Sequence, residues 1–127
     1  MESHLARSPL VPQAPGARAK VEAFLAALEA KGWARLPRRT ELPLPGAAAT
    51  GGMGYADLVV WEPDRAAPSR IHLVDFKLAS ELDAARLEAY AAQLRGYAAA
   101  LKARHPRAAL QAHLWDLEAG RWVALDV

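Results

Sequence analysis

The sequence contains no cysteine, which excludes disulfide bonds and metal sites built from thiolates. A reducing compartment is the simplest setting for such a chain. No stretch approaches the ~18–20 consecutive apolar residues that a membrane-spanning helix needs, and the N-terminal segment lacks the apolar core of a secretory signal. We therefore expect a cytoplasmic protein that has no membrane partner.

A strong net charge is also missing, because the formal value is only +2 at pH 7. A charge of this size does not by itself indicate a nucleic-acid partner. The first 40 residues nevertheless hold three acidic residues and seven basic ones, namely Arg7, Arg18, Lys20, Lys31, Arg35, Arg38 and Arg39. A local basic region can attract a polyanion, although an ordinary solvated surface accounts for the same pattern.

The composition itself is that of a globular domain. The chain has 127 residues, of which 53% are hydrophobic and 24% charged, enough to build one core. Residues 1–16 contain four proline or glycine residues and little periodicity, so we expect a flexible lead-in there. Residues 17–127 show no internal repeat and are expected to form a single domain.

The hydrophobic pattern predicts two helices and five strands. Gly32 is a stop signal after the first helix, and Ser80 is the predicted N-cap of the second. The predicted elements are, in chain order, a helix at 17–31, a proline-punctuated edge strand at 36–45, a hairpin of strands at 55–62 and 70–78, a helix at 81–104, and strands at 108–118 and 120–127. This order predicts a mixed central sheet flanked by helices, of the α/β or α+β class.

The strand at 70–78 holds the most informative charges. Alternation along a strand places Ile71, Leu73, Asp75 and Lys77 on one face, and the two apolar residues direct that face toward the interior. Charges in such a row are costly unless they are paired, bound to a metal or open to a cleft. Taken alone, the pattern is most simply explained by an ion pair between the aspartate and the lysine.

Asp57, near the start of the neighbouring strand, changes this interpretation. If the two strands pair, Asp57 approaches Asp75, and each carboxylate raises the pKa of the other. A divalent cation relieves that conflict, and magnesium prefers oxygen ligands. Lys77 beside the ion could hydrogen-bond the attacking water or neutralise the charge that develops on a phosphate.

The helix at 81–104 adds a third element. Tyr90, Gln93, Leu94, Tyr97 and Leu101 fall on one face of it. Most of such a face is expected to be core. The amide of Gln93 would need hydrogen-bond partners on a buried face, and a cleft that holds a phosphate backbone would supply them.

These residues form three motifs in a fixed order. They are G-Y-A-D ending at Asp57, D-F-K from Asp75 to Lys77, and Q-L-R-G-Y from Gln93 to Tyr97. The set resembles the RecB-type branch of the PD-(D/E)XK nuclease superfamily, in which a G-x-x-D strand, a D-x-K strand and a Q-x-x-x-Y helix follow one another. The resemblance covers about residues 41 to 125 and implies a restriction-endonuclease-like αβββαβ core.

The resemblance also implies roles for individual residues. Asp57 and Asp75 would bind Mg²⁺ or Mn²⁺ together with the backbone carbonyl of Phe76, and Lys77 would be the catalytic lysine. Glu41, which precedes the G-x-x-D strand, is either a further metal ligand or a surface strand residue.

Substrate contacts are expected from two other places. Gln93 and Tyr97 would flank the site and hold the DNA backbone or the lysine. Arg38 and Arg39, from the basic region, are candidate DNA contacts.

The expected function is therefore that of a magnesium-dependent DNA nuclease in repair, recombination or defence. A helicase partner that delivers single-stranded DNA is expected by the same resemblance. Many RecB-type nucleases have a metal-binding histidine on the first helix, whereas the helix at 17–31 has none. Either His4 lies on a helix further upstream or that ligand is absent, which leaves the number of metal ions open.

Two alternatives remain from the sequence. One is a nuclease-fold module with little or no activity that binds nucleic acid or a helicase, and the other is an interaction domain in which D-F-K is only an ion pair.

His72 should face away from Asp75, and His105 and His113 are expected to be structural or solvated. The tryptophans favour core packing over base stacking, and no base-reading motif predicts sequence-specific cleavage.

Overall fold

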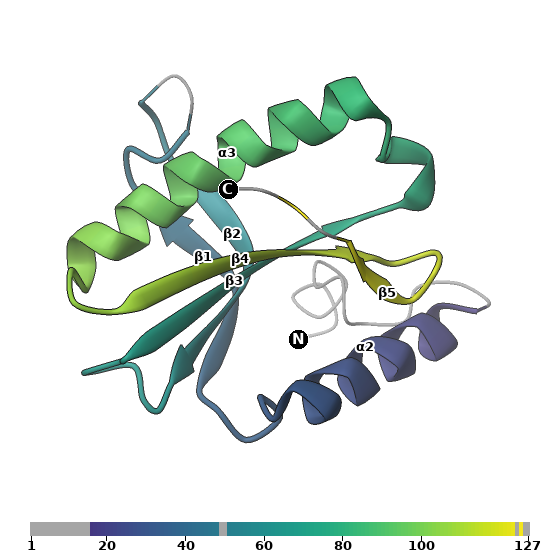
Figure 1. Ribbon diagram of the computed structural model, residues 1–127, viewed down its shortest axis with the longest axis horizontal. Helices are drawn as coiled ribbons and strands as arrows, with labels where there is room; N and C mark the ends of the chain where they lie inside the picture. Colours follow the sequence, from purple (N-terminus) through teal and green to yellow (C-terminus); the bar gives the residue numbers. More distant parts are fainter. Residues whose placement is uncertain (1–15, 49–50, 124, 126–127) are drawn as a thin grey trace, which may run out of the picture.

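A five-stranded mixed sheet lies between two helices in the computed structural model, which describes residues 16–48, 51–123 and 125 (Figure 1). The elements are α2 (Ala17–Lys31), β1 (Arg38–Leu44), β2 (Gly54–Glu62), β3 (Arg70–Lys77), the 3-10 turn η1 (Ala79–Glu81), α3 (Ala84–Arg104), β4 (Ala109–Asp116) and β5 (Arg121–Val123). The predicted order of helices and strands is confirmed, and the class is α+β. Residues 1–15, expected as a flexible lead-in, lie outside the described residues.

The strands lie in the sheet in chain order, from β1 at one edge to β5 at the other. The β3–β4 pair is parallel and the other pairs are antiparallel, so the predicted β2–β3 hairpin is confirmed. A parallel pair requires a crossover, and α3 provides it between β3 and β4. The proline-containing strand lies at an edge, as expected for a residue that cannot donate to a central ladder.

The first helix has the bounds that the sequence predicts. Phe24 and Leu28, one turn apart, are its fully buried residues. The helix ends because Gly32 adopts a left-handed backbone (φ 78°), which lets its N–H bond the carbonyls of Leu28 and Glu29.

The second helix begins later than predicted. Ser80 is not its N-cap, because residues 79–81 form a separate 3-10 turn. Asp83 takes that place instead, and its side chain accepts a hydrogen bond of 2.9 Å from the backbone N–H of Arg86. Strand β5 is described over Arg121–Val123, and residues 124, 126 and 127 of the predicted strand lie outside the described residues.

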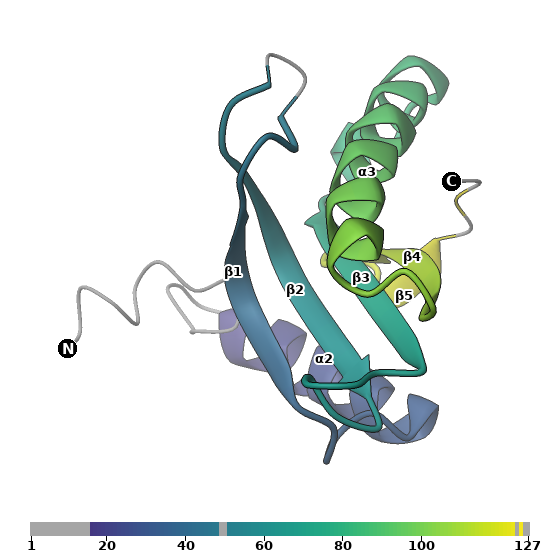
Figure 2. The ribbon, with the colours of Figure 1, turned by 90° about the vertical axis from the view of Figure 1, so that its left-hand side faces the viewer.

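Each face of the sheet packs against one helix (Figure 2). Leu94, Tyr97 and Leu101 of α3 belong to one buried cluster with Leu73 of β3. The other cluster, on the opposite face, contains Phe24 and Leu28 of α2 with these tryptophans and strand residues: Trp33, Leu58, Val60, Val74, Phe76 and Trp115. Because both faces are covered, β3 is buried from its second residue, Ile71, to its seventh, Phe76.

Core packing is the observed role of the tryptophans. Trp33, Trp61 and Trp115 are at most 5% exposed, and Trp122 is half-buried.

In the part of the chain that the structure describes, no helix combines the length and apolar character that crossing a bilayer demands.

Two glycines let the segment between β1 and β2 approach α3 closely. A Cβ atom added to Gly96 would lie 2.9 Å from the backbone oxygen of Ala47, and one added to Gly54 would lie 2.6 Å from a ring carbon of Tyr97. Both distances are shorter than real Cβ contacts, so a larger residue would push the segment away from the helix.

We expect Gly96→Ala to destabilise the protein by about 1–3 kcal/mol, because a backbone oxygen must move to accommodate the new methyl group. This sign is opposite to the gain of about 1 kcal/mol that the same change gives at an unobstructed helix position. Urea unfolding measures the difference, and Ala99→Gly, on the exposed side of α3, calibrates helix propensity in this chain. A stabilised Gly96→Ala variant would contradict the close approach.

Candidate active site

Asp57 and Asp75 meet where β2 and β3 stop pairing. The last paired residues at this end are Leu58 and Val74, and the aspartates are the next residues along each strand. The Oδ2 atom of Asp57 accepts a hydrogen bond of 2.9 Å from the backbone N–H of Phe76. The two aspartates are thus opposite one another in the register, and the charge of Asp57 acts on Asp75. The structure therefore brings the predicted pair together.

An irregularity in β1 and β2 surrounds Asp57. Ala56 packs in the α3 cluster, but Leu58, only two residues further on, packs in the α2 cluster. Regular alternation would put both on one face, so the pattern changes phase at Asp57. Glu41 lies at the register position opposite, with a left-handed backbone (φ 51°) that is uncommon for a non-glycine residue. Such irregularities are frequent beside functional sites.

Asp75 is buried, with 6% of its surface exposed. Burial, followed by the hydrogen bond and the negative charge of Asp57, raises the pKa of Asp75 to about 7, and the charge of Lys77 opposes this rise. The Oδ2 atom is buried and accepts no well-formed hydrogen bond from the described residues. Asp75 therefore retains a proton at neutral pH for much of the time, unless a cation replaces it.

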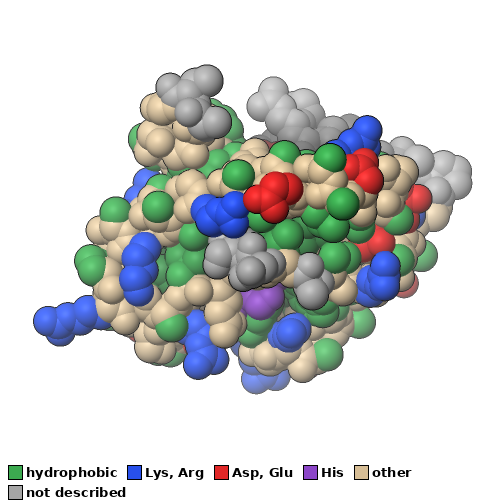
Figure 3. Space-filling model, turned by 45° about the horizontal axis from the view of Figure 1, so that its top comes forward, with side chains coloured by type: hydrophobic (Ala, Val, Ile, Leu, Met, Phe, Trp, Pro, Cys, Tyr) green, Lys and Arg blue, Asp and Glu red, His purple; other side chains and the backbone are tan. Residues whose placement is uncertain are grey.

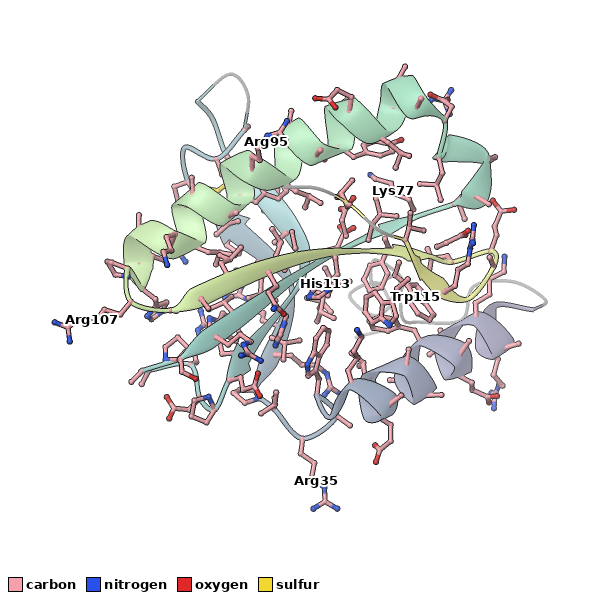
Figure 4. All side chains as sticks on the ribbon, viewed as in Figure 1. Arg35, Lys77, Arg95, Arg107, His113 and Trp115 are labelled. Carbon is pink, nitrogen blue, oxygen red and sulfur yellow. The ribbon has the colours of Figure 1, made fainter. Side chains whose placement is uncertain are left out.

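Lys77 lies beside this pair on the α3 side of the sheet (Figure 4). Its Nζ atom is 3.3 Å from Oδ2 of Asp75 and 4.3 Å from the ring centre of Tyr90 on α3. Burial lowers the pKa of Lys77, but the charges of Asp75 and Asp57 outweigh burial, and the net shift is upward. The lysine thus stays charged near neutral pH and can act as a donor rather than as a base.

Tyr90 is a site residue that sequence reasoning missed. It lies on the helix face singled out by the spacing, but nothing in the sequence pairs that position with Lys77. A cation over an aromatic ring is attracted by about 0.5–2 kcal/mol, which helps to fix the position of the ammonium group.

Gln93 and Tyr97 lie further along the same helix. Gln93 donates a hydrogen bond of 3.0 Å from Nε2 to the Tyr97 hydroxyl. The expectation that Gln93 is on the buried face was wrong, because the side chain lies at the exposed rim of that face. Both residues line a groove of about 630 Å³ between α3 and the segment 46–48. The groove could accept an extended chain.

The remaining candidates lie on β1, separated from Asp75 by β2. Arg38 and Arg39 pair with Val60 and Val59 and are exposed. The Arg38 guanidinium donates to the carbonyl of Ala34 at 2.8 Å. Neither arginine is among the groups that shift the pKa of Asp75. The structure does not bring them into contact with the carboxylates.

The described residues contain no group of three or more aspartate, glutamate or histidine side chains that could hold a metal ion together. Glu41 is exposed and has no effect on the pKa of Asp75. Asp116 is paired in register with Lys77, but its Oδ1 atom accepts the backbone N–H groups of the following turn. His4, the possible extra ligand, lies outside the described residues. The candidate site is therefore two carboxylates and a lysine.

The histidines on the strands belong to the opposite face. His72 faces α2, as predicted, and stacks on Trp33 with 4.0 Å between ring centres. Its Nδ1 atom is 3.3 Å from Nε2 of His113, and its Nε2 atom is 3.1 Å from Oε2 of Glu62. Burial, first of all, lowers the pKa of both histidines. This chain of contacts leaves the strand histidines separate from the carboxylate pair.

Comparison of the sequence with protein-family models and with curated proteins found no match. The case for a function therefore depends on the chemistry of the residues themselves.

The pKa of Asp75 predicts how stability changes with pH in the metal-free protein. The folded state holds this proton more tightly than the unfolded chain, so ionisation between about pH 4 and pH 7 destabilises the fold. The cost is roughly 2–4 kcal/mol at full ionisation. Asp75→Asn should remove it, so the variant gains stability over the wild type as pH rises.

Urea unfolding of both proteins in chelator at pH 5, 6, 7 and 8 measures this difference. Subtraction cancels the contribution of His72 and His113, whose lowered pKa values act in the opposite direction. A difference that stays constant across this range would show that Asp75 ionises as an ordinary carboxyl group.

Proposed function

We propose that this protein is a divalent-cation-dependent nuclease that hydrolyses DNA phosphodiester bonds with Asp57, Asp75 and Lys77. The observation that supports this most is the buried carboxyl pair. Asp75 has its pKa raised to about 7 next to Asp57, and a charged lysine lies 3.3 Å away. Strongly shifted groups with specific charged neighbours are typical of active sites.

The residues fit magnesium or manganese. Every candidate ligand is an oxygen atom, and the buried Oδ2 of Asp75 accepts no well-formed hydrogen bond from the described residues. The N–H of Phe76 bonds Asp57, and the carbonyl of a strand residue points to the same side as its N–H. Asp57, Asp75 and the Phe76 carbonyl would therefore hold the ion, and waters and phosphate oxygens would complete its shell. When bound, such an ion supplies Lewis acidity toward phosphate and favours ionisation of a water.

Lys77 is suited to stabilise negative charge. Its ammonium group remains protonated and is held between Asp75 and the ring of Tyr90. In this position it can donate to a phosphate oxygen or orient the attacking water. The lysine therefore contributes chiefly in the transition state, where charge develops.

The resemblance to RecB-type nucleases supports DNA as the substrate and a restriction-endonuclease-like core as the finer description of the fold. The order of helices and strands is compatible with that core. Gln93 and Tyr97 would then hold the DNA backbone at the groove on α3. A role in repair, recombination or defence, beside a helicase that supplies single strands, follows from the same resemblance. Glu41, at the register position opposite Asp57, would be a further ligand.

A second candidate function is a nuclease-fold module that binds nucleic acid or a helicase without cutting. The observation that favours it is the small ligand set, because only two carboxylates gather in the described residues. Cleavage of DNA in the presence of Mg²⁺ or Mn²⁺ distinguishes the two functions.

In the first test, the purified protein should cut labelled single- or double-stranded DNA in Mg²⁺ or Mn²⁺, and chelator should stop it. Asp75→Asn and Lys77→Ala should each lower the rate by about 10²-fold or more, the size typical for removing a catalytic charge. Lys20→Ala, an exposed position on α2, is the matched control and should leave the rate unchanged.

Thermal unfolding gives a readout that does not need cleavage. Mn²⁺ should raise the melting temperature of the wild type but not of Asp75→Asn. Stabilisation without cutting would favour the inactive module, and equal cutting by Lys77→Ala would remove the lysine from the mechanism.

Tyr90 provides a finer test of the lysine. Tyr90→Phe keeps the ring and should retain most of the rate, whereas Tyr90→Leu keeps apolar volume but lacks the ring and should slow cleavage severalfold. The expected loss is in kcat rather than in KM, because the ring positions the ammonium group without touching substrate. Equal rates in the two variants would exclude a role for the ring.

A further inference from the structure

The end of the sheet opposite the carboxylates gathers positions that are far apart in sequence. Strand β1 begins with Arg38, which pairs with Val60 near the end of β2. Strand β3 begins with Arg70, which pairs with Glu62 and with Ala109 at the start of β4. The C-terminus of α3 also reaches this end, because only residues 105–108 join it to β4. One end of the molecule is thus built from five elements.

Exposed arginines lie on these elements and in the loops that join them. We call them the basic end, which consists of Arg38, Arg65, Arg70, Arg104 and Arg107. Figure 3 shows lysine and arginine side chains toward the left and lower part of one face, whereas acidic side chains lie near its centre and toward the right, where lysine and arginine side chains also occur. Figure 4 places Arg107 at the left end of the molecule and Lys77 to the right of the centre. Positive charge therefore prevails at the end that holds Arg107, although the total is only +2.

The arginines of the basic end differ from several other lysine and arginine side chains in whether they pair with a carboxylate. In the described part of the chain, lysine and arginine ion pairs involve Lys77, Arg86, Arg95 and Arg121, and none of these belongs to the basic end. An exposed guanidinium without a carboxylate partner keeps donors available for an anion, and Arg38, which donates once to the carbonyl of Ala34, still has others.

The two acids at this end are already engaged. The Glu62 carboxylate bonds His72 at 3.1 Å, and the Asp64 carboxylate accepts the backbone N–H of Ala67 at 2.8 Å. The Arg65 guanidinium lies 4.4 Å from the centre of the Trp61 ring, which holds it in place without neutralising it. These contacts do not remove the two negative charges, but the five arginines outnumber the two carboxylates, so an excess of positive charge remains at this end.

A hollow provides a place for a bound anion. Arg104 and Arg107 line a depression of about 390 Å³, with Ala67 and Pro68 on its other side. His105, Pro106 and Ala108 complete its lining, in which the two arginines are the permanently charged residues. Planar forks of this kind bind phosphate oxygens in pairs.

We propose that the basic end binds the phosphate backbone of a polynucleotide. Spaced arginines that lie on several elements, rather than in one closed pocket, fit a repeating anion better than a single small one. Arg38 was expected as a DNA contact from the sequence, but the other four arginines lie beyond the basic first 40 residues, and only the fold brings them together.

The spacing adds a second consequence, which rests on the proposed nuclease function. Strand β3 joins Arg70 of the basic end to Lys77 and, because successive residues of a strand are about 3.3 Å apart, separates the two by roughly 23 Å. A duplex advances about 3.4 Å per base pair, so about seven base pairs separate the two places. A substrate shorter than this cannot contact both.

The test is equilibrium binding of fluorescein-labelled 24-mer DNA, single- and double-stranded, followed by anisotropy in chelator. Arg104→Gln/Arg107→Gln should weaken binding about tenfold at low salt and reduce the slope of log K against log salt by about 2. The control is Arg86→Gln/Arg95→Gln, which removes the same charge from ion-paired arginines of α3 and should change binding less than twofold. Equal weakening in both variants, or none in either, would overturn the proposal.

Two further measurements distinguish a failure of this proposal from a failure of the proposed nuclease function. Polyglutamate of matched charge should compete at least tenfold more weakly than DNA, and equal competition would indicate an acidic polypeptide partner instead. In Mg²⁺, the Arg104→Gln/Arg107→Gln change should slow cleavage of the 24-mer but not of a six-base-pair duplex. If the wild type does not cleave DNA but binds it in a way that depends on Arg104 and Arg107, the proposed nuclease function is wrong and the proposed binding by the basic end is supported.

Discussion

The structure depends on one electrostatic conflict, which is the burial of Asp75 beside Asp57. Two carboxyl groups in a poorly hydrated place cannot both ionise cheaply, so the protein must supply a proton, an ammonium group or a cation. Here the backbone N–H of Phe76 bonds one carboxyl group and Lys77 lies beside the other. The surrounding core is what makes the conflict strong, because helices on both faces exclude water from β3.

Much of the fold could be predicted from the sequence because its signals are local. Glycine at 32 stops a helix, prolines mark an edge strand, and alternation identifies the strand that ends in Lys77. The start of α3 could not be predicted, because both Ser80 and Asp83 are good caps and only the 3-10 turn decides between them. The phase change at Asp57 leaves no local signal either, since it needs a left-handed residue on the neighbouring strand.

The candidate site shows the same division. The pairing of Asp57 with Asp75 could be predicted because a hairpin fixes which residues are neighbours. The placement of Tyr90 over Lys77 could not, because the angle between a crossover helix and its sheet is set by packing across the whole interface. Gln93 was expected on the buried face, but a helix face has a rim, and only a fraction of a turn separates the rim from the core. The basic end likewise arises only when distant elements meet.

The distorted edge strand has a consequence for how these molecules behave together. A straight edge strand offers a row of free amide and carbonyl groups on which a second copy can add its own strand. Here β1 contains Pro43, which has no N–H to donate, and the left-handed Glu41 bends the chain two residues earlier. An incoming strand meets an interrupted ladder, so the irregularity beside Asp57 also keeps the sheets of neighbouring molecules from joining edge to edge.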